Sequence, residues 1–445
     1  MAHSEAQVLD APKQKRTHKR FFIVFLLFIT VVINYLDRAN LSIAAPAMMQ
    51  DLSLTTEQIG LIFSAWGLAY ASFQIPAGWL VDKFKPKYFL PVILILWSIA
   101  TVAIGFVSNF MLIIALRFVV GMFEAPSYPI NSKIVTNWIP ENERASSIAI
   151  YTSAQFVGLA FLAPVLSWLL ITYNWQMVFI ATGVVGIVWG VIWYFTYDEP
   201  QEFKGISQSE LDYLGEHGAL LDSKAKEKEA TQEATNVDTS FAKDLIYICT
   251  RKKIIGTCIG QFALGCATIF FLTWFPTYLV EYHNLSFVKA GFMASLPFLC
   301  GFLGVICSGF TSDYLLNRGY SLATARKVPI ITGLLLTSTI IGAEFFQSPA
   351  MVVVFMSIAF FATGLASITW TLVASIAPQR LIGLTGGVFN FVGGLSAVIC
   401  PAVIGYLATG ESFFYPLLFI VCMSFMGVLS YLFLVGKVER IEDRV

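Results

Sequence analysis

The chain has 445 residues, of which 57% are hydrophobic and 13% are charged, and its mean hydropathy is +0.73. Soluble proteins carry about 25% charged residues, so the composition excludes an ordinary soluble domain. The 28 basic and 28 acidic residues balance, and we interpret the basic runs as topology signals rather than as patches that bind nucleic acid. Apolar runs long enough to cross a bilayer recur along the chain, so we expect an all-α polytopic protein whose surroundings are the lipid bilayer.

Twelve membrane-spanning helices are predicted from these runs. In chain order they cover residues 21–47, 57–81, 88–107, 111–137, 146–170, 175–197, 254–281, 288–314, 327–346, 349–375, 382–408 and 414–435. Basic residues precede the first span and follow the second and the last, whereas the opposite side holds Lys289 and almost nothing else. By the positive-inside rule both termini are expected in the cytoplasm.

A long polar stretch divides the spans into six and six. The predicted organisation is an N-terminal tail (1–20), a six-helix bundle (21–197), a cytoplasmic linker (198–253), a second six-helix bundle (254–435) and a C-terminal tail (436–445). Within the linker, Ser207 and Glu210 have capping-box spacing for a short helix. Residues 222–238 are poor in apolar side chains, and we interpret them as a solvated tether, with a regulatory role as the alternative.

The two halves resemble each other in sequence. "GWLVDKFKPK" follows the second span and "GFTSDYLLNRG" follows the eighth. In each stretch a glycine stands four residues before an aspartate, which is Asp82 in the first half and Asp313 in the second. Arg144 and Arg380 each precede a glycine by fourteen residues. These correspondences predict a duplicated six-helix unit, as in one class of secondary transporter.

Several of these stretches are similar to signatures of a known family. "GWLVDKFKPK" resembles the loop signature of the major facilitator superfamily, although Lys85 and Lys87 stand where that pattern prefers other residues. "NYLDRANLSIA", "FSAWGLAYASFQIPAGWL", "RFVVGMFEAPSYP" and "RLIGLTGGVFNFVGG" resemble the anion:cation symporters of that superfamily. The resemblance implies two pseudo-symmetric bundles, a bacterial inner-membrane location, a monomer, protons as the coupling ion and no other cofactor.

Four ionisable residues lie deep inside predicted spans: Asp37, Arg38, Arg117 and Glu124. Each would cost about 2.5–3.5 kcal/mol at the bilayer centre, so they are expected to face one another or a wet cavity. Arg117 and Glu124 are two turns apart on one helix face, whereas neighbours in sequence such as Asp37 and Arg38 diverge by about 100°. A salt-bridge cluster that only fixes helix packing is the alternative.

This set of side chains permits coupled binding of an anion and protons. A carboxylate beside an arginine changes protonation when its partner is drawn away, and a guanidinium can bind a carboxylate at two points. The resemblance assigns proton coupling to Asp37 and Glu124 with Arg117 as their partner, and substrate binding to Arg38. Asp82, Asp313 and Arg144, near the cytoplasmic ends, are expected to act in gating.

Further polar and aromatic residues lie in the middle of spans from both halves: Tyr35, Tyr70, Gln155, Gln261, Ser367, Thr369, Trp370 and Asn390. For any one of them an interhelical hydrogen bond is a sufficient explanation. As a group they predict a site for a polyhydroxylated ligand at the bundle interface, with aromatics against its C–H faces. The resemblance implies that Tyr70, Gln155, Gln261 and Asn390 belong to that site.

The expected activity is proton-coupled import of a small sugar-acid anion, with galactonate or another hexonate first and a hexuronate, glucarate or galactarate as the alternative. A passive channel and a membrane enzyme are the competing classes. No HExxH motif, P-loop or Cys/His cluster is present in the sequence, which disfavours a metal site and an enzyme. The seven cysteines are expected to be packing residues without disulfides.

Overall fold

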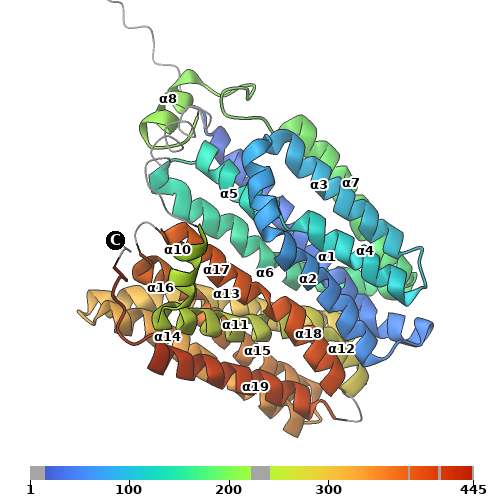
Figure 1. The fold of residues 1–445 in the computed structure, drawn as a ribbon. Coiled ribbons are helices and arrows are strands. Elements are labelled where there is room, and N and C mark those ends of the chain that lie inside the picture. Colours follow the sequence, from blue (N-terminus) through green and yellow to red (C-terminus); the bar gives the residue numbers. More distant parts are fainter. Residues whose placement is uncertain (1–15, 222–240, 379–380, 409–411, 443–445) are drawn as a thin grey trace, which may run out of the picture.

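The computed structural model describes residues 16–221, 241–378, 381–408 and 412–442, and these residues form helices and no strand. Eleven helices in the described part are long and apolar enough to cross a membrane. The remaining predicted span is α2, whose 28 residues also exceed the ~20 needed for a bilayer. Together they make the predicted twelve-helix architecture of two six-helix bundles, coloured blue to green and yellow to red in Figure 1.

The helices of the first half and of the linker follow the predicted spans closely and mostly extend them by a few residues at their ends. They are α1 (Lys19–Leu52), α2 (Thr56–Lys83), α3 (Pro86–Ile104), α4 (Phe110–Glu124), α5 (Ser127–Trp138), α6 (Glu141–Thr172), α7 (Trp175–Thr196), α8 (Gln208–Glu216) and α10 (Phe241–Cys249). α4 and α5 share the predicted fourth span and meet at Pro126, and α8 and α10 lie in the linker.

The second half is more often interrupted. Its elements are α11 (Lys252–Thr273), α12 (Phe275–Thr277), the π-helix η1 (Tyr278–Tyr282), α13 (Phe287–Asn317), α14 (Leu322–Thr337), the 3-10 helix η2 (Ser338–Phe345), α15 (Pro349–Leu365), the 3-10 turn η3 (Ala366–Ile368), α16 (Thr369–Ile376), α17 (Ile382–Gly394), α18 (Ser396–Leu407), α19 (Phe414–Leu429) and the π-helix η5 (Ser430–Leu434). The single spans predicted for 349–375 and 382–408 are therefore each built from consecutive shorter helices.

Helix contacts repeat between the halves. In the first half α2 packs on α4 and α3 packs on α7, and in the second half their equivalents α13 and α15, and α14 and α19, pack in the same way. Across the interface, α6 packs on α13 and α2 packs on α18, which are also equivalent pairs. This arrangement agrees with the duplicated six-helix unit predicted from the sequence.

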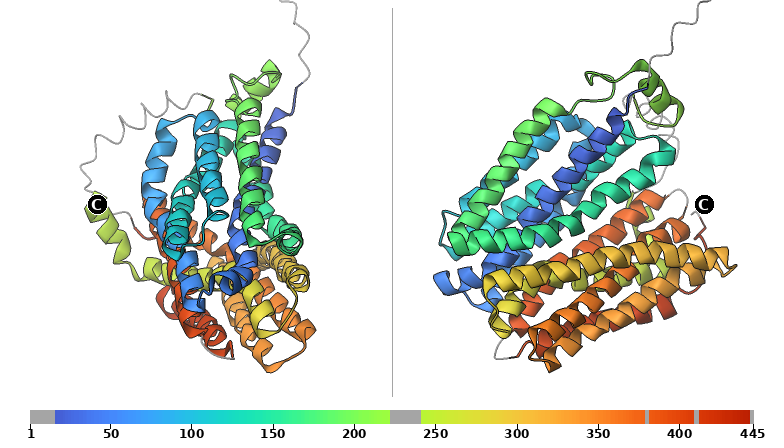
Figure 2. Two further views of the ribbon diagram at one scale, coloured as in Figure 1. Left: turned by 90° about the vertical axis from the view of Figure 1, so that its right-hand side faces the viewer. Right: turned by 180° about the vertical axis from the view of Figure 1, so that it is seen from behind.

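The halves touch closely at one end of the molecule. We call the end at which α1 begins the terminal end, and the opposite one the far end. Near the far end a Cβ on Gly60, in the second turn of α2, would lie 2.6 Å from the backbone oxygen of Pro401, so only glycine permits this approach of α2 to α18. Ser64 Oγ donates to the backbone oxygen of Val398 at 2.7 Å. Toward the terminal end the two bundles diverge (Figure 2).

The first part of the linker is docked on the first half. Ser207 Oγ accepts the backbone N–H of Glu210 at 3.2 Å, which confirms the predicted cap of α8. The Glu210 carboxylate, fully buried, does not close the capping box; it accepts the backbone N–H groups of Lys19 and Arg20, at 3.0 and 3.3 Å, and caps α1 instead. Residues 222–238, interpreted above as a tether, lie outside the described residues.

Arg20 ties this contact to a third element. Its Nη1 is 3.1 Å from Glu210 Oε1, and its Nε is 2.7 Å from Glu143 Oε2 at the start of α6. The hydrogen bond from Arg20 lowers the pKa of Glu143 below its ordinary value. A depressed carboxylate pKa means that the pair is intact above the ordinary glutamate range and loosens as the pH falls through the lowered pKa. We call the three residues Arg20, Glu143 and Glu210 the linker clasp.

Glu210→Ala is expected to release the linker clasp. Removing the Glu210 carboxylate leaves the Arg20 guanidinium and the first N–H groups of α1 without their acceptor. The loss of one partner of a buried ion pair costs about 3 kcal/mol of local stability. Backbone amides of α8 and of the first turn of α1 should then exchange with deuterium about a hundredfold faster. Hydrogen–deuterium exchange of the purified protein measures this. Glu216→Ala, on an exposed residue of the same helix, is the matched control; equal exchange in both variants would contradict the clasp.

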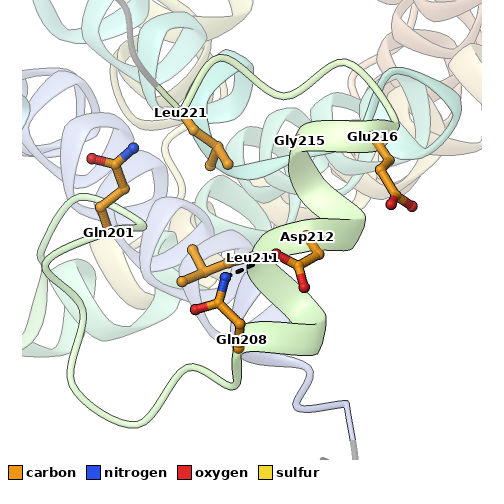
Figure 3. A pocket seen from close by; sticks show the side chains of 7 residues that line it. All are labelled: Gln201, Gln208, Leu211, Asp212, Gly215, Glu216 and Leu221. Atoms are coloured by element: carbon orange, nitrogen blue, oxygen red, sulfur yellow. Dashed lines mark hydrogen bonds between the residues drawn. The ribbon is translucent and has the colours of Figure 1, made fainter. Parts of the chain in front are cut away.

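The outer face of α8 is hollowed (Figure 3). Gln208 Nε2 donates to Asp212 Oδ1 at 2.8 Å across this hollow, and Gln201, Glu216 and Leu221 lie at its rim. The other end of the linker, α10, packs against the second half, where Tyr247 donates its hydroxyl to the backbone oxygen of Glu442 at 2.8 Å. Each end of the linker is thus bound to the bundle it adjoins.

Candidate functional site

Two of the four deep charges form an ion pair between α1 and α4. Arg38 Nε lies 3.3 Å from Glu124 Oε2, and Glu124 is fully buried. Trp66 of α2 donates its indole N–H to the same carboxylate oxygen at 3.1 Å. Arg38 Nη2 and Glu124 Oε1 have no hydrogen-bond partner among the described residues. The pair therefore has donor and acceptor capacity left for a ligand or a proton.

Three aromatic rings surround the guanidinium of Arg38. Its central carbon lies 4.7 Å from the ring centroid of Trp66, 4.8 Å from that of Tyr35 and 5.1 Å from that of Tyr70. Trp66 and Tyr70 are one turn apart on α2 and stack at 5.0 Å. Cation–π contacts of this kind stabilise and orient a guanidinium without neutralising its charge. Arg38 is thus held in position with its charge available.

Asp37, the neighbour of Arg38, points elsewhere. It accepts the indole N–H of Trp97 on α3 at 2.7 Å and is 1% exposed. Arg117 is also buried, and none of the described ion pairs includes it. The charges of Glu124 and Asp37 nevertheless both act on it. The direct partner of Glu124 is therefore Arg38, and none of the described ion pairs joins Arg117 to either carboxylate.

A cavity of about 790 Å³ lies between the halves. Its described lining comes from α2, α5 and α6 on one side and from α11, α16 and α17 on the other: Tyr70, Ala71, Gln74, Tyr128, Pro129, Ser132, Ile148, Tyr151, Thr152, Gln261, Trp370, Asn390, Phe391, Gly393 and Gly394. Ser132 and Ile148 lie toward the terminal end, away from the closed contact of α2 with α18. The cavity is large enough for a small organic ligand.

The residues predicted to bind substrate lie in and behind this cavity. Tyr70, Gln261, Trp370 and Asn390 line it. Tyr35 and Gln155 are not among the described lining residues, but hydrogen bonds connect them to Tyr128, which is. The Tyr35 hydroxyl donates to Gln155 Oε1 at 2.6 Å and accepts from the Tyr128 hydroxyl at 3.4 Å. On the other side, Thr369 donates to Gln261 Oε1 at 2.7 Å. Ser367 is half-buried on the η3 turn and is not among the described lining residues.

Several lining residues were missed by the sequence analysis. Gln74 is one turn from Tyr70 on α2, and Tyr151 and Thr152 precede Gln155 on α6, so spacing from the predicted residues could have found them. Tyr128 and Ser132 lie on α5, after the turn at Pro126 that separates it from α4. The predicted span 111–137 is continuous and contains no turn. It therefore does not indicate that these two side chains point toward the cavity.

Interruptions in the helices of the second half occur beside the cavity. The η3 turn directly precedes Thr369 and Trp370, and the junction of α17 with α18 at Leu395 directly follows Gly393 and Gly394. Binding sites of secondary transporters typically lie at such discontinuous helices, because the freed backbone groups can face a polar cavity. The side chains of the predicted gating residues Asp82, Arg144 and Asp313 lie outside the described part of the structure.

Two related six-helix bundles with a cavity between them are the architecture of one class of secondary transporter. A family model described as Major Facilitator Superfamily matches residues 27–401, and the chain belongs to this superfamily. It is a transporter and not an enzyme.

Individual relatives are similar over nearly their whole length. The "D-galactonate transporter" of Escherichia coli O6:H1 is 46% identical over 96% of this chain and 98% of its own. The "Probable galactarate/D-glucarate transporter GarP" of Escherichia coli strain K12 is 40% identical over 97% of this chain and 98% of its own. A solved structure of a bacterial homolog to the human lysosomal transporter Spinster has a TM-score of 0.73 at 18% identity, over 95% of this chain and 98% of that one, which supports the fold. The names of both curated relatives describe transporters of sugar acids.

Proposed function

We propose that this protein imports a monocarboxylic sugar acid together with protons, by exposing its central cavity alternately to the two sides of the membrane. The observation that supports this most directly is the ion pair between Arg38 and Glu124, because the Arg38 guanidinium also lies against the ring of Tyr70, which lines the cavity. A substrate carboxylate competes with Glu124 for the same guanidinium. Protonation of Glu124 removes that competitor and frees Arg38 to bind the anion, so proton and substrate binding assist each other.

The substrate class follows from the charge of the cavity. Among its described lining residues none is basic. We assign the substrate carboxylate to the Arg38 guanidinium, which is not itself among these residues but lies against the ring of the lining residue Tyr70. Hydroxyl and amide groups of Tyr151, Gln261 and Asn390 suit the polyol chain of a hexonate, and Trp370 offers an apolar face. The similarity to a D-galactonate transporter makes galactonate or a related hexonate the first candidate.

A dicarboxylic sugar acid is the second candidate, because relatives at about 40% identity are described as probable galactarate/D-glucarate transporters. Such a substrate carries a second carboxylate, and the described lining gives that group no basic partner. An unpaired charge in a site of low dielectric is costly. We therefore expect hexonates to be preferred over aldarates.

The direction of transport follows from topology. The terminal end carries the basic residues of the N-terminal tail and of the loop after α2, which supports a cytoplasmic location for both termini in a bacterial inner membrane. The far end, where Gly60 meets Pro401, then faces outward and is closed, and the cavity reaches toward the cytoplasm. We propose a monomer as the transporting unit, since each chain holds a complete cavity.

Uptake into proteoliposomes tests this function. Labelled galactonate should accumulate when the outside is acidic, and saturable counterflow should be present, which a channel would not give. With two protons per monoanion, one net positive charge enters with each substrate molecule. An inside-negative potential at equal pH should therefore add about 2.3 kcal/mol per 100 mV to the driving force for accumulation. Unlabelled galactonate should compete better than galactarate or a hexuronate. Downhill equilibration without accumulation under either gradient would refute proton coupling, and stronger competition by galactarate would refute the monocarboxylate preference.

A further inference from the structure

The carboxylate of Asp37 is buried on the side of α1 that faces α3 and α7, and we call its surroundings there the Asp37 pocket. Trp97 of α3 is fully buried and donates its indole N–H to Asp37 Oδ2 at 2.7 Å. Asn40, one turn further along α1 and also fully buried, lies with its Nδ2 3.3 Å from Asp37 Oδ1. Both donors are neutral. They can therefore stabilise the ionised carboxylate without adding a positive charge that would compete with Arg38.

The two donors are fixed by the packing of α3 on α7. Asn40 Nδ2 also donates to Thr182 Oγ1 on α7 at 3.1 Å. One residue beyond, a Cβ on Gly183 would lie 2.6 Å from the backbone oxygen of Ser98, which adjoins Trp97. The two helices therefore approach to backbone contact at the level of the pocket. This rigidity leaves the Trp97 ring no room to turn away from the carboxylate.

The charged groups that act on Asp37 come from α4. Glu124 and Arg117 both interact with it electrostatically, and both are buried. The ionisable side chains of α3 and α7 are Lys87, Tyr88 and Tyr194, which lie in the terminal-end turns of their helices. Of the groups in contact with the carboxylate, Trp97 makes the shortest described hydrogen bond.

We propose that Trp97, assisted by Asn40, is a positioning residue that holds the Asp37 carboxylate in this pocket, apart from the cavity, and sets the pH at which it takes up its proton. The inference rests on the proton coupling proposed above. The indole N–H stabilises the ionised form of Asp37, so that proton uptake requires a more acidic medium than it would without this bond. The proton site is thereby separated from the anion site, although the residues that carry them, Asp37 and Arg38, are adjacent in sequence.

Trp97→Phe tests this role. It keeps an aromatic ring in the pocket and removes the N–H, so protonation of Asp37 should become easier. The pH profile of gradient-driven uptake should move to higher pH by about one to two units, as expected for the loss of one hydrogen bond to a charged group. Saturable counterflow should persist, because it needs no net proton movement. Asn40→Ala should move the profile in the same direction by less, and it serves as the second variant if Trp97→Phe does not fold.

Trp189→Phe is the matched control. Its indole N–H is also buried between helices of the same half, but it donates to the neutral Thr30 hydroxyl, at 3.0 Å. This variant should lose comparable stability and keep the wild-type pH profile. An unchanged profile in folded Trp97→Phe, or an equal shift in Trp189→Phe, would overturn the proposal. A wild-type protein that shows no pH-driven uptake would instead refute proton coupling itself, so the two failures are distinguishable.

Discussion

Exchanging Arg38 for lysine is expected to weaken substrate binding by about a hundredfold, nearly as much as exchanging it for alanine. Lysine keeps the charge but loses the planar fork that binds a carboxylate at two points, and its ammonium stacks less well within the Tyr35, Trp66 and Tyr70 rings. A charge-assisted hydrogen bond contributes about 1.5–3 kcal/mol, which corresponds to one to two orders of magnitude in affinity. Calorimetric titration of the purified variants with galactonate measures the difference.

Arg251→Lys provides the control for this exchange. Arg251 is exposed at the start of α11, and its guanidinium stacks on the Tyr247 ring at 3.9 Å, far from the cavity lining. The same chemical change there should leave affinity unaltered. Near-normal affinity in Arg38→Lys would show that a positive charge alone suffices, and it would remove the geometric part of our argument.

Asp37→Asn and Glu124→Gln are each expected to abolish accumulation driven by a pH gradient, leaving internal substrate no higher than external. An amide cannot carry a proton through the transport cycle. Glu124→Gln also removes the charge that competes for Arg38 and resembles the protonated glutamate, so galactonate binding and counterflow should persist in this variant. The measurement combines gradient-driven uptake with counterflow in the same proteoliposome preparations.

The two carboxylates should differ in their effect on binding. Glu124 contacts Arg38 directly, so its neutralisation should make galactonate affinity less dependent on pH. Asp37 contacts Trp97 and lies away from the cavity, so its neutralisation should leave that dependence largely in place. Accumulation by both variants at the wild-type level would exclude these carboxylates from coupling. Loss of counterflow in both would instead favour a structural role for the buried charges.

We propose a coupling sequence on the basis of these contacts. The proton on Glu124 frees the guanidinium, the substrate carboxylate takes its place, and the cavity then holds no net charge from this exchange. With the charges neutralised, moving the halves past the bound anion no longer exposes an unpaired ion to the membrane interior. Release of the substrate and of the Glu124 proton on the cytoplasmic side then returns Arg38 to the ionised Glu124. In the proposed cycle Asp37 contributes a second proton from its separate position, and such a cycle is electrogenic.

The sequence by itself determined the membrane class, the twelve spans, the repeat of six helices and the depth of the four buried charges. These properties depend on hydrophobicity and spacing along a single helix, which are local. It also identified Tyr70, Gln261, Trp370 and Asn390 as candidates, because polar side chains in the middle of apolar spans need partners. Only the tertiary structure decided which partner each one has.

Tertiary structure decided, first, that Arg38 rather than Arg117 pairs with Glu124, and that Asp37 faces Trp97. Neighbours on a helix diverge by about 100°, and the helix that each one meets depends on how α1 is rotated against α2, α3 and α4. It decided, second, that Tyr128 reaches the cavity, because the chain turns at Pro126. Helix rotation and helix turns arise from contacts between segments far apart in the chain, and these contacts leave no periodic pattern in the sequence.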